Sequence, residues 1–264
     1  MSRARLVALD VDGTLLTYDG VLSDEARAAV AAVSRAGLHV VLATGRGVHS
    51  TVPVARELGM TDAYLVCSNG AVTVRLDPDL DDGFEVVQTV TFDPEPALRA
   101  VAMAMPDTLY AVEDLGVGYR VSAPFPPGEL TGEIRVVPFD ELVGTPATRV
   151  VIRAPRAEPE ELRALAERLG LHEVEYWIGW TAWLDLSPGG VSKATALEEV
   201  RRRLGVEPFA TVAVGDGNND LRMLEWAARG VAMGHAGAEV RAAADKVTGT
   251  IEDDGVVPVL RSLL

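Results

Sequence analysis

Residues 6–15 read Leu-Val-Ala-Leu-Asp-Val-Asp-Gly-Thr-Leu, and this stretch decides the fold. An apolar run with the character of a β-strand ends abruptly in Asp10 and Asp12, and Gly13 allows the backbone to turn sharply at their level. In an open α/β sheet, ligands bind outside the carboxyl ends of the strands, so this acid pair lies where chemistry can occur. Two carboxylates crowded together repel each other, and a bound cation normally relieves that repulsion. We therefore expect a divalent metal ion at the end of this strand.

Length and composition indicate a globular protein of about two domains. The chain has 264 residues, of which 48% are hydrophobic, and a net charge of −15. This charge argues against a nucleic-acid-binding surface and against binding to an anionic membrane face. The first apolar run is broken at Asp10, too soon for a secretion signal, and no later window approaches a membrane span. We expect a cytoplasmic protein without nucleic-acid or membrane partners, either a monomer or a homodimer.

Cysteine and lysine are both scarce in this chain. The single cysteine, Cys67, excludes an intramolecular disulfide, and its surroundings lack the spacing of a reactive thiol, so we expect it to fill the core. Of 24 basic residues, only Lys193 and Lys246 are lysine. A compact ammonium can meet one oxygen as a point charge, which a planar guanidinium does not do equally well. A lysine in such a chain therefore suggests a chemical role.

Strands and helices alternate at both ends of the chain. In the first part, strands are expected over residues 5–9, 38–43 and 63–67, and helices over 24–36 and 47–58, the first of them capped by Ser23. In the last part, helices are expected over 193–204 and 218–228, strands over 210–214 and 231–233, and a closing helix after Asp254. This alternation predicts an α/β fold built on a doubly wound parallel sheet.

The pattern changes between these two parts. Strands of period two are expected over residues 85–92, 109–112, 148–154 and 182–186, together with helices over 94–104 and 158–169 and connections rich in proline and glycine. We interpret residues 83–187 as an α+β domain inserted into a core formed by residues 1–82 and 188–264.

Four loops are expected at the same edge of the core sheet. They contain Asp10 and Asp12, Thr44-Gly45-Arg46, the helix start at Lys193, and Gly215-Asp216-Gly217-Asn218-Asn219-Asp220. These residue types fit phosphoryl transfer: a carboxylate nucleophile, a hydroxyl and amides for phosphate oxygens, a lysine to neutralise them, and carboxylates for Mg²⁺. Asp10 would attack phosphorus, while Asp12 would protonate the leaving oxygen and later deprotonate a water.

Together these motifs resemble the haloacid dehalogenase superfamily of phosphotransferases. The chain looks most like the Cof-type branch, subfamily IIB, whose members carry a large C2-type cap between the second and third motifs. The long interval between Thr44 and Lys193 leaves room for such a cap. Ser68-Asn69-Gly70-Ala71 and the tail from Val231 to Val256 also match that branch, so the resemblance covers the whole chain.

The resemblance implies a role for each motif residue. Three aspartates would carry the chemistry and the Mg²⁺: Asp10 as nucleophile and metal ligand, Asp12 as acid/base and metal ligand through its carbonyl oxygen, and Asp216 as metal ligand. The phosphate would be held by Thr44, Gly45, Lys193 and Asn219. Supporting positions would be Asp220, Arg46 and Asn69, the last two acting either in loop structure or near the cap.

Some residues depart from the family pattern or stay open. Ala194 follows the motif lysine where the family often has glycine, and His235 stands where the tail usually has asparagine. We interpret His235 as an exposed loop histidine without a role; close to the site, it would make substrate binding sensitive to pH near neutrality. Trp177, Trp180 and Trp183 are expected to pack within the cap, with one ring closing over a substrate carbon skeleton as the alternative.

Three functions remain open from the sequence. The leading hypothesis is a Mg²⁺-dependent phosphatase that hydrolyses a small soluble phosphate monoester, such as a sugar phosphate, through an aspartyl phosphate. The first alternative is a phosphomutase or phosphotransferase that uses the same intermediate with a sugar acceptor, and the second is a non-catalytic phospho-acceptor module. Nicotinamide binding is disfavoured, because Gly215-x-Gly217 lacks the final glycine of the dinucleotide fingerprint.

Overall fold

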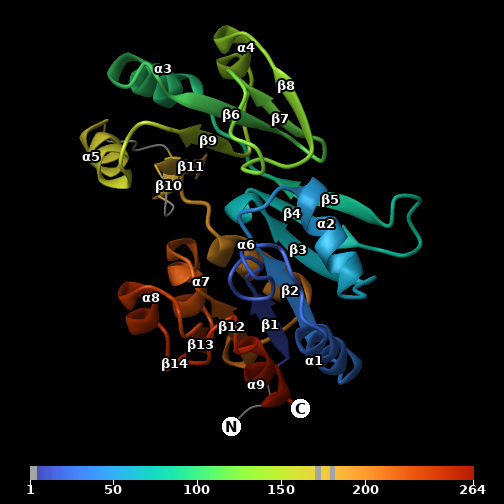
Figure 1. Cartoon of the computed structure of the whole chain (residues 1–264). Helices are drawn as coiled ribbons and strands as arrows, with labels where there is room; N and C mark the ends of the chain where they lie inside the picture. Colours follow the sequence, from blue (N-terminus) through green and yellow to red (C-terminus); the bar gives the residue numbers. More distant parts are fainter. Residues whose placement is uncertain (1–4, 170–173, 179–181) are drawn as a thin grey trace. The chain divides into compact units, whose positions relative to one another are not determined.

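The chain folds into two compact units. The computed structural model describes residues 5–169, 174–178 and 182–264 (Figure 1). The first unit comprises Met1–Arg46, Thr51–Gln88 and Ser192–Leu264, and the second comprises Gly47–Ser50 and Thr89–Val191. Each unit contains its own β-sheet.

An eight-stranded sheet forms the centre of the first unit, in the order β14-β13-β12-β1-β2-β3-β4-β5. Its strands are β1 (Leu6–Leu9), β2 (His39–Ala43), β3 (Ala63–Cys67), β4 (Val72–Leu76), β5 (Phe84–Thr89), β12 (Thr211–Gly215), β13 (Arg229–Ala232) and β14 (Lys246–Val247). β1 pairs in parallel with both β2 and β12, and the parallel pairing continues to β3 on one side and to β13 and β14 on the other. β4 runs antiparallel to β3. The predicted parallel sheet is therefore confirmed, with an antiparallel extension at one edge.

The order in which the chain adds strands reverses at β1. β2 and β3 lie on one side of β1, whereas β12 to β14 lie on the other, so that Leu6 faces His39 on one neighbour and Thr211 on the other. At such a reversal the loops after adjacent strands leave to opposite sides, which opens a crevice at the carboxyl end of the sheet. Asp10 follows β1 and Asp216 follows β12, so the reversal places both at that crevice.

Helices cover the centre of this sheet. They are α1 (Asp24–Arg35), α2 (Val48–Glu57), α6 (Lys193–Arg203), α7 (Leu221–Trp226), α8 (Ala238–Ala243) and α9 (Val256–Arg261). Apolar side chains of α6, α7 and α8 pack in one cluster with Leu6 and Ala8, while α1 packs against β2 and α9. All four residues of β1 are fully buried, as expected for a central strand covered on both faces. Ser23 caps α1 as predicted, because its Oγ accepts the N–H of Ala26.

Among its described residues, the second unit combines a six-stranded sheet with three helices. The sheet order is β10-β11-β9-β6-β7-β8, and the pairs are antiparallel except for β7 with β8. Its elements are α3 (Glu95–Ala104), β6 (Leu109–Asp114), β7 (Gly118–Val121), β8 (Glu133–Val136), α4 (Phe139–Val143), β9 (Val150–Arg153), α5 (Pro159–Leu169), β10 (Val174–Ile178) and β11 (Trp183–Pro188). Leu98 of α3 and Leu162 of α5 pack on Val112 and Ile152 in this unit's core. The α+β character expected for the insertion is confirmed.

Several expectations about elements need correction. The strand expected over 85–92 in the inserted domain is β5, and it belongs to the first sheet, so that prediction is wrong. The chain divides into its compact units after Gln88 and after Val191, while the domain limits of 83 and 187 stay a prediction. The helix expected over 218–228 begins as a 3-10 turn at Asn218–Asp220, and α7 ends at Trp226.

Two predictions about single side chains can also be compared with the structure. Cys67 is fully buried at the end of β3, as expected for a core residue. Trp183 packs within the second unit, with its ring edge-to-face on Phe125 at 6.4 Å between ring centroids. The side chain of Trp177 and all of Trp180 lie outside the described residues.

Within the described ranges, the helices are all too short or too polar to cross a lipid bilayer.

Candidate active site

The loops after β1, β2, β3 and β12 bring most of the predicted site residues together, all within the first unit. The loop after β1 carries Asp10 and Asp12, the loop after β2 carries Thr44 to Arg46, and the turn after β12 carries Asp216 to Asp220. Asp10 is held at the strand end because its N–H donates to the carbonyl oxygen of Val214 in β12, at 3.0 Å. The sheet itself therefore aligns the two acid-bearing strand ends.

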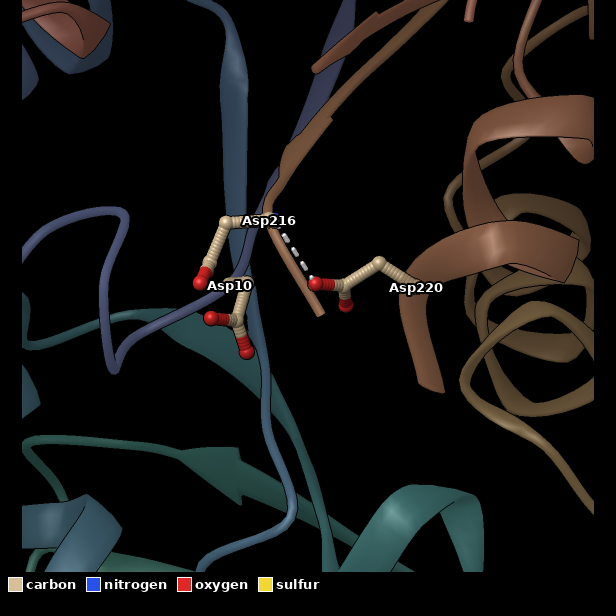
Figure 2. A group of neighbouring side chains, drawn as sticks. All are labelled: Asp10, Asp216 and Asp220. Atoms are coloured by element: carbon tan, nitrogen blue, oxygen red, sulfur yellow. Dashed lines mark hydrogen bonds between the residues drawn. The ribbon is translucent and has the colours of Figure 1, made fainter. Parts of the chain in front are cut away.

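Asp10, Asp216 and Asp220 form an acid cluster. One carboxylate oxygen from each lies within 4.8 Å of the others. Figure 2 shows Asp10 and Asp216 at neighbouring strand ends, with Asp220 reaching toward them from the start of the following helix. Asp220 also shapes the loop, because its Oδ2 accepts the N–H groups of Asp216 at 3.0 Å and Gly217 at 2.9 Å.

Gly13 is required where the chain passes closest to this cluster. Its φ is +79°, and a Cβ built on it would lie 2.4 Å from Oδ2 of Asp216. Any side chain there would both strain the backbone and displace that carboxylate. The next residue, Thr14, is buried and donates its hydroxyl to Oδ1 of Asp216 at 3.1 Å.

Lys193 occupies the interior of the acid cluster. Its side chain is fully buried, and its Nζ donates to Oδ1 of Asp10 and to Oδ1 of Asp220, each at 2.6 Å. Ser192 caps α6 in a reciprocal arrangement with Thr195, which fixes where the lysine begins the helix. Burial alone would lower the pKa of Lys193, but the charges of Asp10 and Asp220 outweigh it and raise that pKa, so the ammonium stays protonated.

The cluster carries more negative than positive charge. Burial, followed by the charge of Asp220, raises the pKa of Asp10 well above its usual value despite Lys193, and the same two causes raise the pKa of Asp216. Three carboxylates facing one ammonium can thus accommodate a further positive charge. Because carboxylate oxygens are the hard donors that Mg²⁺ prefers, the donor set fits this ion.

Asp12 lies apart from the three clustered carboxylates. Its side chain is 41% exposed, and Arg46 holds it through Nε to Oδ2 at 2.8 Å and Nη2 to Oδ1 at 2.5 Å. The hydrogen bonds to Asp12, and then its charge, raise the pKa of Arg46 despite partial burial. The structure therefore assigns Arg46 a definite contact, which the sequence left open between loop structure and the cap.

Thr44, Gly45, Asn69 and Asn219 lie together where three loops meet. Thr44 is buried; its Oγ1 accepts the N–H of Arg46 and its carbonyl accepts the N–H of Asn69. Asn219 Nδ2 donates to Oδ1 of Asn69 at 2.9 Å, and a Cβ on Gly45 would lie 3.3 Å from that same oxygen. The predicted phosphate-binding residues of the β2 and β12 loops are thus tied to one another through Asn69.

Tyr18 and His235 also reach the acid cluster. Tyr18 was not among the predicted site residues, yet its hydroxyl donates to Oδ2 of Asp216 at 2.7 Å. Burial and this hydrogen bond raise the pKa of Tyr18, which keeps the hydroxyl a donor. His235 has a side chain only 20% exposed, with Nε2 at 3.6 Å from the same Oδ2, so its interpretation as an exposed loop residue is wrong. The unusual histidine in the tail was the one sequence signal for this contact.

Comparisons with known proteins agree with this geometry. The model of the haloacid dehalogenase-like hydrolase family matches residues 7–112 and 130–260. A phosphoglycolate phosphatase of Natronomonas pharaonis is 31% identical over 257 residues, which cover 96% of this chain and 95% of that protein. A 5-amino-6-(5-phospho-D-ribitylamino)uracil phosphatase of Bacillus subtilis is 26% identical over 268 residues, covering 97% and 96%.

A solved structure supports the same assignment. A phosphatase of the haloalkanoate enzyme superfamily from Bacteroides thetaiotaomicron superposes with a TM-score of 0.80 at 26% identity, covering 99% of this chain and 95% of that one. The family match spans nearly all of the three segments of the first unit and most of the second unit. The chain therefore belongs to the haloacid dehalogenase-like hydrolases and is a phosphatase of the Cof-type branch.

Proposed function

We propose that the protein hydrolyses a small phosphate monoester in a Mg²⁺-dependent reaction that passes through a phosphate ester of Asp10. The observation that carries this proposal is the position of Asp10: at the end of β1, at the strand-order reversal, beside Lys193 and two further carboxylates. A nucleophile, a fixed positive charge and metal-binding oxygens at one sheet edge form the set that phosphoryl transfer needs.

Asp10 would act as the nucleophile. Lys193 binds Oδ1, and among the described contacts no hydrogen bond uses Oδ2, which is the oxygen we assign to the attack on phosphorus. A bond forms between this oxygen and phosphorus while the bond from phosphorus to the alcohol oxygen breaks. A water then attacks phosphorus, releases inorganic phosphate and restores the carboxylate of Asp10.

Asp12 would act as the general acid and base. Two residues beyond the nucleophile, it would give a proton to the departing alcohol oxygen and later take one from the attacking water. In the substrate-free structure its carboxylate is partly exposed, and both of its oxygens accept hydrogen bonds from Arg46. The Arg46 contact must therefore loosen when Asp12 takes up a proton.

The remaining site residues would hold the phosphate and the metal ion. Mg²⁺ would be held by Asp10, Asp216 and the carbonyl oxygen of Asp12, with Asp220 close by, and when bound it would neutralise charge between the nucleophile and the phosphoryl group. Phosphate oxygens would contact the ammonium of Lys193, the hydroxyl of Thr44, the N–H of Gly45 and the amide of Asn219.

The substrate is defined only as a class. The two curated relatives share a similar level of identity with this chain, yet one is named for phosphoglycolate and the other for a phosphorylated ribitylaminouracil. Overall similarity therefore does not choose between them. Both names describe small phosphorylated metabolites, which supports that class of substrate for this protein.

A phosphate-release screen over phosphorylated metabolites tests the proposal. The wild-type protein should release phosphate with Mg²⁺ and not with EDTA. Asp10→Asn should lose at least about 10³-fold in kcat, because the amide cannot form the ester. Asp81→Asn, at an exposed turn, is the matched control and should stay fully active. Activity that persists in Asp10→Asn would reject the nucleophile assignment.

Asp12→Asn separates proton transfer from binding. It should still bind Mg²⁺ and phosphate but lose about 10²- to 10⁴-fold in kcat, the usual contribution of a general acid/base. Full activity would reject the role of Asp12. Repeating the wild-type assay with added sugar acceptors distinguishes hydrolysis from transfer: a phosphorylated acceptor formed at the expense of inorganic phosphate would identify a phosphotransferase or phosphomutase.

A further inference from the structure

Both carboxylate oxygens of Asp216 are held by donors from the segment that follows β1. Thr14 donates to Oδ1 at 3.1 Å, and Tyr18 donates to Oδ2 at 2.7 Å. Each oxygen of a carboxylate has two lone pairs, so one on each remains for a cation. Asp216 can therefore bind a metal ion, but its plane cannot turn freely.

The position of Tyr18 indicates that its hydroxyl matters more than its ring. The residue lies in a tight turn closed by the hydrogen bond from Gly20 N–H to Thr17 O, and the flanking Leu16 and Leu22 pair as a bridge. Although Tyr18 is 59% exposed, its hydroxyl reaches the buried acid cluster. A residue placed there for core packing would show the opposite pattern, with its ring buried.

His235 approaches the same oxygen from another loop. Its Nδ1 accepts the N–H of Ile251 at 3.2 Å, so the proton of the neutral ring is on Nε2. Nε2 lies 3.6 Å from Oδ2 of Asp216, and the imidazole stands edge-to-face with the Tyr18 ring at 6.2 Å between centroids. The imidazole thus packs beside the tyrosine, with Nε2 near Oδ2 of Asp216 but beyond hydrogen-bond distance.

We propose that Tyr18, by donating to Oδ2, and His235, by packing against the Tyr18 ring, are positioning residues for the metal-binding carboxylate of Asp216, and that together they make the site select Mg²⁺ over Ca²⁺. This inference rests on the proposed function, because it takes Asp216 as a metal ligand. Mg²⁺ demands near-ideal octahedral geometry, whereas Ca²⁺ accepts flexible and bidentate carboxylates. A carboxylate whose two oxygens are both held therefore favours Mg²⁺, whereas a carboxylate that can rotate favours Ca²⁺.

Calorimetric titration with MgCl₂ and with CaCl₂ tests the inference on the full-length protein without substrate. Tyr18→Phe removes only the hydroxyl from a largely exposed side chain, so the fold should be kept, as thermal unfolding in EDTA will verify. The Kd for Mg²⁺ should rise about tenfold, the usual scale for losing a group that orients a metal ligand, while the Kd for Ca²⁺ should rise less. His235→Ala should also raise the Kd for Mg²⁺ more than the Kd for Ca²⁺, but by a smaller factor than Tyr18→Phe.

Tyr64→Phe is the matched control, because this tyrosine packs near the other core residues of β3 and should leave both Kd values unchanged. If the wild type binds Mg²⁺ and Tyr18→Phe keeps the same or a lower Kd and the same ion preference as Tyr64→Phe, the positioning role is overturned and the proposed function stands. If the wild type does not bind Mg²⁺ at all, both proposals fail.

Discussion

Lys193 is fully buried between the carboxylates of Asp10 and Asp220. Protein interiors accept an ammonium only when its charge is paired and its hydrogen bonds are made. Here the pairing also serves the site, since the same ammonium orients the proposed nucleophile. Removal of the ammonium would leave both carboxylates without its compensating charge.

Lys193→Met should therefore destabilise the protein strongly. We expect a loss of about 3 kcal/mol in the free energy of unfolding in EDTA, the lower end of the range for breaking a buried ion pair, and loss of turnover. Mg²⁺ should restore part of the stability, because a cation replaces the missing positive charge. Urea unfolding with and without Mg²⁺ measures both effects.

Lys246→Met provides the control for that measurement. Lys246 is exposed in β14, so its replacement should change neither stability nor activity. Equal stability of the two variants would contradict the importance of the buried pairing.

At the level of single residues, the sequence predicts those that stand at strand ends. Asp10, Thr44 and Asp216 follow apolar strands, and these strand ends meet at one edge of the sheet. Tyr18 and His235 could not be predicted, because their contacts to Asp216 depend on how a tight turn and a tail loop fold back from distant parts of the chain. Asp220 was expected only to support the site, whereas its carboxylate lies among the possible metal-binding oxygens.

Glu198 joins two helices that lie beside the site. Its carboxylate, on α6, accepts hydrogen bonds from Arg201 and Arg202 of the same helix and from Nε1 of Trp226 at the end of α7, the last at 3.1 Å. These donors, Arg201 first, lower the pKa of Glu198 to about 2. Since α6 begins at Lys193, this junction helps fix the helix that carries the site lysine.

Glu198→Gln should reduce stability in a pH-dependent way. A carboxyl group whose pKa is lower in the folded state stabilises the fold above its unfolded pKa, and this contribution is lost as the pH falls toward the folded pKa. The variant should be less stable by about 1 kcal/mol at pH 7, allowing for solvent screening, and the difference should shrink between pH 4.5 and about 2. Urea unfolding followed by circular dichroism at pH 7 and pH 3 measures it.

Glu199→Gln is the neighbouring control. Glu199 is 49% exposed and has a contact to Arg202 at 3.8 Å, so its replacement should have little effect at either pH. A difference between wild type and Glu198→Gln that stays constant with pH would show that charge is not the cause.

At the level of elements, local patterns identify helices and strands but not the sheet in which a strand pairs. β5 has the same period-two appearance as strands of the second unit, and only its neighbours in the first sheet reveal where it belongs. β7 and β8 were missed, being four residues each. The capping signal of Ser23 before α1 was interpreted correctly because capping is local.

The two units have separate sheets and separate cores, so the molecule should unfold in two steps. The proposed metal site lies wholly in the first unit. Mg²⁺ at 100 times its Kd should therefore stabilise the first unit by about 2.7 kcal/mol and leave the second unit unchanged. Calorimetry with and without Mg²⁺ should show one transition that moves and one that does not.

The tryptophans allow the second transition to be followed alone. Of the four tryptophans, only Trp226 belongs to the first unit. In Trp226→Phe, the tryptophan fluorescence therefore reports the second unit, and its melting temperature should not respond to Mg²⁺. A shift equal to that of the first unit would show that the two units unfold together.

For the whole molecule, the sequence predicts an α/β core interrupted by an α+β insertion because the two parts differ in periodicity. It assigns the strand over residues 85–92 to the insertion, whereas β5 belongs to the first sheet. Local sequence patterns also do not predict the order of the strands in the sheet. It is the reversal of this order at β1 that brings Asp10 beside Asp216.

The scarcity of lysine, combined with the burial of Lys193, has a practical consequence. Amine-reactive labels require an accessible, unprotonated amine, which Lys193 does not offer, because it is fully buried and its pKa is raised by two carboxylates. Apart from the chain's amino terminus, Lys246 is then the one place where such a reagent can attach. A fluorophore or surface tether introduced through amines would thus mark a defined position on β14, the end strand of the first sheet, and would leave the proposed chemistry untouched.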